Sequence, residues 1–175
     1  HKIFGAEVSY QGAPTPDGSE IPSQFKSLFK TTIADTTTQH HKPWLLSVFK
    51  DNAGVVAFTE EDVVCLKVET HNSPSALDPF GGAITGIVGV NRDILGTGIG
   101  AKPVFNTNVF CVGPTHFQGN LPEKMHHPKD LLEGVRLGVE DGGNQSGIPT
   151  VNGAVLFDES YMGKPLIFVG SGGYM

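Results

Sequence analysis

Cysteine, positive charge and long apolar runs are all scarce in this sequence of 175 residues. Its two cysteines, Cys65 and Cys111, exclude a disulfide framework and a cysteine-rich metal site. Twelve Lys and Arg against eighteen Asp and Glu give a net charge of −6, without a basic stripe, which argues against a nucleic-acid binder. No apolar run approaches the roughly 18 residues of a transmembrane helix, so we expect a cytoplasmic protein that does not bind membranes.

Glycine is abundant, with 23 residues, and 12 prolines accompany it. Both residue types favour tight turns, and glycine also allows close backbone contacts. The hydrophobic content of 38% is that of a globular protein with an ordinary core. A length of 175 residues suits one domain, so we predict a single domain over residues 1–175.

Hydrophobic periodicity predicts helices and strands that interleave along the chain. Predicted helices cover residues 22–34, the stretch after Pro79 through Leu95, and a segment that begins at Pro128, with a loop over 35–43. Predicted strands are residues 44–49, 55–59, 63–71, 103–112, 151–157 and 166–169. Together they predict an α+β fold, in which a mixed or antiparallel sheet is layered with helices.

The strand predicted at residues 63–71 has two unlike faces, because successive side chains of a strand point to opposite sides. One face carries Val64, Leu66 and Val68, and the other carries Lys67, Glu69 and His71. A cation, a carboxylate and an imidazole in one row are not expected in a hydrophobic core, because burying charged groups is costly. They suit a site that meets a metal-bound phosphate and a reacting group, and the alternative interpretation is a solvated face of an edge strand.

Each side chain of this row has a chemistry that such a site needs. Lys67 offers a point charge for a phosphate. Glu69 offers the hard oxygen ligands that Mg²⁺ prefers. His71 offers an imidazole that can act as a base. Asn72 and Ser73 add short hydrogen-bonding side chains where the strand ends, and ligands commonly bind at such places.

Arg92 and Asp93 follow the glycine-rich stretch at residues 81–86. Taken alone, the pair is typical of a surface ion pair. Beside a strand that carries Glu69, Asp93 is a second candidate ligand for Mg²⁺. Arg92 is a candidate for binding a substrate phosphate through two parallel hydrogen bonds. Glycine costs a helix about 1 kcal/mol relative to alanine, so the glycines within the predicted helix indicate close packing or close approach to a ligand.

Three blocks of sequence resemble phosphoribosylformylglycinamidine synthase, an ATP-dependent synthetase of purine biosynthesis. They are residues 67–76 (KVETHNSPSA), 78–86 (DPFGGAITG) and 91–96 (NRDILG), and residues 147–153 and 157–161 resemble the same family. The resemblance implies a fold like the N-terminal half of aminoimidazole ribonucleotide synthetase, whose sheet pairs with a second copy to form a barrel. It also implies that the chain is the N-terminal nucleotide and substrate domain of a longer synthase.

The resemblance implies a role for each site residue as well. It assigns ATP contacts to Lys67 and His1, Mg²⁺ ligation to Glu69 and Asp93, substrate contacts to Thr70, His71, Asn72, Ser73 and Arg92, and catalytic proton acceptance to His71. Ser73 stands where many members of the family have a second histidine.

The implied reaction uses ATP and Mg²⁺ to phosphorylate the amide oxygen of formylglycinamide ribonucleotide. Ammonia derived from glutamine then displaces the phosphate and gives the amidine. The implied partner is a glutaminase subunit or domain. The domain is expected to form a homodimer and to be inactive without the rest of the synthase.

Two other functions stay open. Enzymes that act on selenophosphate, thiamine monophosphate or aminoimidazole ribonucleotide share this ATP-using architecture, but the combination of residues 70–72 (THN) with 91–93 (NRD) argues against them. Alternatively, the chain by itself is a dimerising module without catalytic activity.

Overall fold

The computed structural model describes residues 4–175. The chain divides into two compact units, with the boundary between Leu45 and Leu46. The expectation of one domain over residues 1–175 stays a prediction. Among the described residues, no helix is both long enough and apolar enough to cross a membrane.

The first unit consists of a short two-stranded sheet and a helix. Strand β1 (Val8–Ser9) pairs antiparallel with β2 (Gln24–Phe25). A π-helical segment, η1 (Lys30–Ala34), continues directly into the α-helix α1 (Asp35–Gln39).

The helix predicted over residues 22–34 is wrong at both ends. Part of its first turn forms β2, and backbone that is paired as a strand cannot also begin a helix. The helix extends instead through residue 39, into the loop predicted at 35–43. Threonine hydroxyls in this helix donate to carbonyl groups four residues back, as Thr38 does to Ala34 at 3.0 Å, so the polar side chains are satisfied within the helix.

The second unit is built on a six-stranded sheet with the strand order β3-β4-β5-β8-β6-β7. The strands are β3 (Leu45–Ser47), β4 (Gly54–Ala57), β5 (Val63–Thr70), β6 (Lys102–Val112), β7 (Thr150–Phe157) and β8 (Leu166–Tyr174). The pairs β4–β5, β5–β8 and β8–β6 are antiparallel, whereas β6–β7 is parallel. A parallel pair needs a crossover, which α4 (Pro128–Ser146) provides. The predicted α+β fold with a mixed sheet is therefore confirmed.

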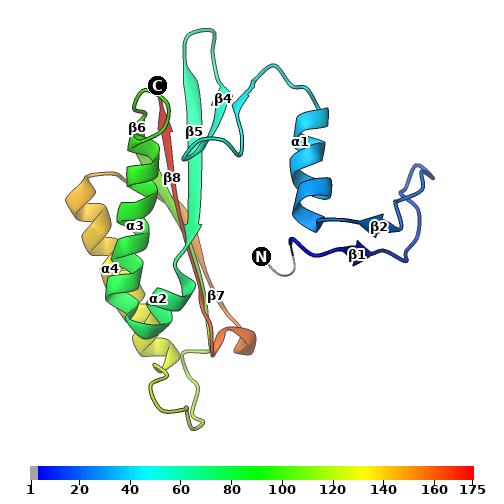
Figure 1. The fold of residues 1–175 in the computed structure, drawn as a ribbon. Helices are drawn as coiled ribbons and strands as arrows, with labels where there is room; N and C mark the ends of the chain where they lie inside the picture. Colours follow the sequence, from blue (N-terminus) through cyan, green and yellow to red (C-terminus); the bar gives the residue numbers. More distant parts are fainter. Residues whose placement is uncertain (1–3) are drawn as a thin grey trace. The chain divides into compact units, whose positions relative to one another are not determined.

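Two long helices, α3 (Pro79–Leu95) and α4, cover one face of this sheet (Figure 1). Each begins with proline after a capping side chain: Asp78 accepts a hydrogen bond from the Gly81 N–H at 3.0 Å, and His127 caps α4. Two short helices, α2 (Asn72–Leu77) and η2 (Glu159–Tyr161), were not expected from the sequence, because neither is long enough to show a helical period.

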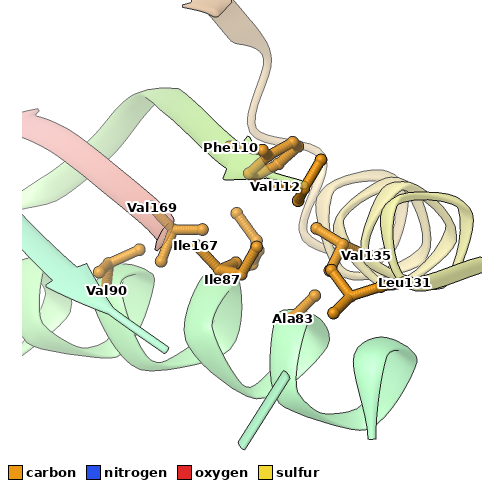
Figure 2. Packing of buried hydrophobic residues seen from close by; sticks show 9 residues of the cluster. All are labelled: Ala83, Ile87, Val90, Phe110, Val112, Leu131, Val135, Ile167 and Val169. Carbon is orange, nitrogen blue, oxygen red and sulfur yellow. The ribbon is translucent and has the colours of Figure 1, made fainter. Parts of the chain in front are cut away.

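The main core lies between α3, α4 and the central strands (Figure 2). Its buried side chains come from four elements, and they are Ala83, Ile87 and Val90 of α3, Leu131 and Val135 of α4, Phe110 and Val112 of β6, and Ile167 and Val169 of β8. This packing holds α3 against the sheet beside β5, where the predicted site residues lie.

Glycines let α3 approach its neighbours closely. A Cβ atom on Gly82 of α3 would lie 2.4 Å from the backbone nitrogen of Ser75 in α2. A Cβ atom on Gly138 of α4 would lie 2.4 Å from the carbonyl oxygen of Phe80 in α3. The expectation that glycines in α3 mark close packing is confirmed at Gly82.

The helices cover the charged face of β5 rather than its apolar face. Leu66 and Val68 lie on the uncovered face, where 51% and 43% of their surface is exposed. Lys67 lies on the covered face and contacts Asp93 of α3. The alternation of the sequence correctly separates the two faces, but the apolar face does not enter the core of the described chain.

We predict that Gly138→Ala destabilises the protein, by about 1–3 kcal/mol in the free energy of unfolding, because the added methyl group overpacks the contact between α3 and α4. Gly143→Ala on the same helix is the control, because a Cβ atom there meets nothing within 4 Å. It should instead stabilise the helix by up to about 1 kcal/mol. Urea unfolding of both variants measures the difference, and equal effects of the two substitutions would contradict it.

Candidate active site

A pocket of about 380 Å³ lies between the end of β5 and α3. It is lined by Glu69 and His71 at the end of the strand, and by Ile84, Thr85, Gly86, Val88, Gly89, Arg92 and Asp93 of the helix. The structure thus brings together four of the side chains that the sequence singled out, from two segments separated along the chain.

Lys67 joins the two carboxylates at the edge of this pocket. Its Nζ atom lies 2.9 Å from Oε1 of Glu69 and 3.1 Å from Oδ2 of Asp93. The hydrogen bond with Glu69 is the largest cause that raises the pKa of Lys67, and the contact with Asp93 adds to it. The ammonium group therefore stays charged at neutral pH, and two carboxylates from different elements converge on a single cationic centre.

His71 stands at the junction of β5 and α2. Its backbone N–H donates to the carbonyl oxygen of Ile167 at 2.9 Å, which holds the residue against β8. A Cβ atom on Gly86 would lie 3.3 Å from the Cβ atom of His71, so glycine at this position lets α3 pass close to the imidazole. Nδ1 of the ring is buried and has no hydrogen-bond partner within the described residues.

Several predicted site residues do not line the pocket. Thr70 lies on the uncovered face of β5. Asn72 uses its side-chain oxygen to accept a hydrogen bond of 2.8 Å from the Ile167 N–H. Ser73 is exposed in the first turn of α2, and His1 lies outside the described residues. The ligand contacts assigned to these residues stay predictions.

The helical wall of the pocket was not predicted from the sequence. Thr85, Val88 and Gly89 lie on the same face of α3 as Arg92. These positions are spaced by three or four residues, which is the spacing that places side chains on one face of a helix. The same spacing, counted back from Arg92, identifies them from the sequence.

The geometry suits the binding of a phosphorylated ligand together with a cation. Arg92 lines the pocket with a guanidinium that can bind a phosphate through two hydrogen bonds. Glu69 and Asp93 supply carboxylate oxygens on the same side, which are hard ligands for Mg²⁺. His71 lines the same pocket with an imidazole, which is a side chain that can act as a general base.

Residues 50–175 match the family described as "AIR synthase related protein, N-terminal domain", and the chain belongs to this family. Within it, the chain is similar to PurL, a subunit of phosphoribosylformylglycinamidine synthase. The subunit from Thermoplasma volcanium is 38% identical over 127 residues, which are 73% of this chain and 16% of that protein. The chain thus spans about a sixth of the length of this relative.

Solved structures of Thermotoga maritima PurL share the fold. The complex with ADP superposes with a TM-score of 0.60 at 29% identity, over 79% of this chain and 21% of that chain. The complex with FGAR superposes with a TM-score of 0.59 at 30% identity, over 79% of this chain and 20% of that chain.

We predict that Glu69→Gln lowers the pKa of Lys67 more than Asp93→Asn does, because the hydrogen bond with Glu69 is the larger cause of the raised value. Titration of the Lys67 Nζ signal by NMR measures both shifts.

The sign for stability follows from the same shift. Because the pKa of Lys67 is raised on folding, the stabilisation is fully present below the unfolded value of about 10.4 and is lost as pH rises through the folded value. The free energy of unfolding near neutral pH should therefore not change with pH through the titration of Lys67.

For the two variants, a larger drop of the Lys67 pKa in Asp93→Asn than in Glu69→Gln would show that Glu69 is not the main cause of the raised pKa.

Proposed function

We propose that this chain is the N-terminal ATP- and substrate-binding domain of a phosphoribosylformylglycinamidine synthase. The observation that carries the proposal is the convergence of Glu69 and Asp93 on Lys67, beside a pocket that also holds His71 and Arg92. The similarity to PurL structures with bound ADP and FGAR supports the proposed ligands. The match to only 16% of a PurL relative supports a role within a longer synthase, and we expect negligible turnover from these residues alone.

Glu69 and Asp93 fit the binding of Mg²⁺. Lys67 Nζ is within 3.1 Å of an oxygen from each, so the two carboxylates already share one cation. When bound, the ion would neutralise charge that spreads over the transferring phosphoryl group. Lys67 would contact the phosphates of ATP, and Arg92 would hold the substrate phosphate.

In the proposed reaction, the amide oxygen of formylglycinamide ribonucleotide attacks the γ-phosphorus of ATP, and ADP leaves. Ammonia then attacks the activated carbon. The new C–N bond forms, the C–O bond to phosphate breaks, and His71 accepts the proton that the nitrogen loses. The enzyme is accordingly a carbon–nitrogen ligase with glutamine as the source of ammonia. A glutaminase subunit or domain would supply it, and the solved PurLQS assembly of Thermotoga maritima supports such a partner.

We predict that Glu69→Gln abolishes the Mg²⁺-dependent part of binding of a non-hydrolysable ATP analogue, because one of two anionic oxygen ligands is lost. Calorimetric titration with and without Mg²⁺ measures it. Glu61→Gln is the matched control, since Glu61 is exposed and lies outside the pocket.

In the complete synthase, we predict that His71→Gln retains analogue binding and lowers turnover by roughly 10²–10⁴-fold, which is the usual contribution of a general base. Steady-state kinetics of the two proteins measure the difference.

Two results would count against this assignment. Analogue binding that is equally strong in Glu69→Gln and Glu61→Gln would remove the metal role of Glu69. Unchanged turnover in His71→Gln would remove the catalytic role of the imidazole.

We also propose that the uncovered face of the sheet binds a second copy of the domain and closes into a barrel. This face carries exposed apolar side chains, among them Leu66 and Val68 of β5. Gly170 and Gly172 of β8 lie opposite these two residues. A Cβ atom on Gly172 would lie 2.3 Å from the Phe105 ring of β6, so side chains of the neighbouring strands fill the space over the glycines. Exposed apolar side chains that share one face of a sheet favour an interface.

We predict that Val68→Asp prevents self-association, because a carboxylate would be buried at the centre of the interface. Leu137→Asp on α4 is the control, because Leu137 is exposed to nearly the same degree, 42% against 43%. Sedimentation velocity over a range of concentrations measures the oligomeric state. A wild-type protein that remains monomeric, or an equal loss of association in both variants, would refute the proposal.

A further inference from the structure

A row of polar side chains crosses the helix-covered face of the sheet and ends at the site. Lys67 of β5 lies directly opposite Ser171 of β8, and Ser171 lies directly opposite Asn106 of β6. Directly opposite residues of antiparallel strands have Cβ atoms about 4.5–5.5 Å apart, so the three side chains are neighbours. Ser171 and Asn106 are both fully buried. The row therefore connects the ion pairs of the site with the interior.

Asn91 meets this row from the helix side. The amide nitrogen of Asn106 donates to the side-chain oxygen of Asn91 at 2.8 Å and to the carbonyl oxygen of Gly170 at 3.1 Å. One amide group thus ties together α3, β6 and β8. Asn91 is 6% exposed and lies two residues before Asp93, the residue of α3 that contacts Lys67.

Stability alone gives no reason for polar groups at these positions. The side-chain nitrogen of Asn91, the side-chain oxygen of Asn106 and the hydroxyl of Ser171 are buried, and they have no hydrogen-bond partner within the described residues. A buried polar group without a partner costs about 1–3 kcal/mol, and apolar side chains of similar shape would avoid that cost. Buried polar contacts of this kind can instead specify one arrangement of the elements that they join.

We propose that Asn91, Asn106 and Ser171 form a buried polar layer that positions Lys67 and Asp93 for the metal-bound phosphates. These three are positioning residues, since none of them lines the pocket. The layer acts on Asp93 through the placement of α3, and on Lys67 through the adjacent position of Ser171 across the strands. The consequence for ligand affinity rests on the function proposed above.

Asn106→Leu tests the layer, because it removes the amide and keeps the same branched shape. Asn108→Leu is the matched control. Asn108 lies on the same face of the same strand and is 6% exposed, and its side-chain oxygen is also without a hydrogen-bond partner within the described residues. Its directly opposite residue on β8, however, is the apolar Val169. Ser171→Ala is a second test of the layer that removes only one hydroxyl, in case Asn106→Leu does not fold.

The first readout is the NMR signal of the Lys67 Nζ atom, which needs no ligand. We expect Asn106→Leu and Ser171→Ala to move this signal toward that of Asp93→Asn, while Asn108→Leu leaves it in place. The second readout is calorimetric affinity for the ATP analogue with Mn²⁺ in place of Mg²⁺. We expect a loss of roughly 10-fold or more in Asn106→Leu, as for other groups that orient metal ligands, and a loss below about 2-fold in Asn108→Leu.

Each outcome decides between the two proposals. A Lys67 signal that is unchanged in the layer variants, or moved equally by Asn108→Leu, would refute the layer. A moved signal with unchanged affinity would refute its link to ligand binding. A wild-type protein that binds no analogue would count against the proposed function, and the Lys67 signal would still decide whether the layer positions the ion pairs.

Discussion

The contact of Lys67 with Glu69 and Asp93 is the interaction on which the site depends. A partly exposed ion pair contributes little to stability by itself, typically about 0–1 kcal/mol. Its importance here is geometric, because the contact of Lys67 with Asp93 joins β5 to α3 beside the pocket. Without the ammonium group, two carboxylates would face one another beside the pocket. The same arrangement that Lys67 neutralises is one that can accept a divalent cation.

That arrangement requires α3 to lie very close to the sheet and to its neighbours. Gly82 and Gly86 allow this on one side of the helix, where any larger side chain would meet α2 or His71. Gly138 allows it on the side that faces α4. The cost of glycine within a helix is about 1 kcal/mol each. In return, the buried contacts in Figure 2 hold α3 against α4, β6 and β8. Because β5 is paired with β8, the same contacts keep α3 beside the strand that carries Lys67.

The two faces of the sheet separate two tasks. The face under α3 and α4 combines an apolar core with a polar row that leads from Asn106 to Lys67. The other face carries exposed apolar side chains and glycines, and it suits association with another protein surface. The chain belongs to the AIR synthase related family and is similar to a small part of PurL, which supports the proposed role within a longer synthase.

From the sequence alone follow the class of fold, the main strands and helices of the second unit, and four of the side chains that line the pocket, namely Glu69, His71, Arg92 and Asp93. Alternation along β5 separated its two faces, and the proline and capping residues marked where α3 and α4 begin. Local patterns could not show that Gln24 pairs as a strand, that β6 and β7 run parallel, or that Asn72 uses its side chain on Ile167. That helices cover the charged face of β5 follows from the packing of α3 against the strands, with Lys67 in contact with Asp93. Which face is buried depends on where distant elements pack, and no periodicity within one strand records that.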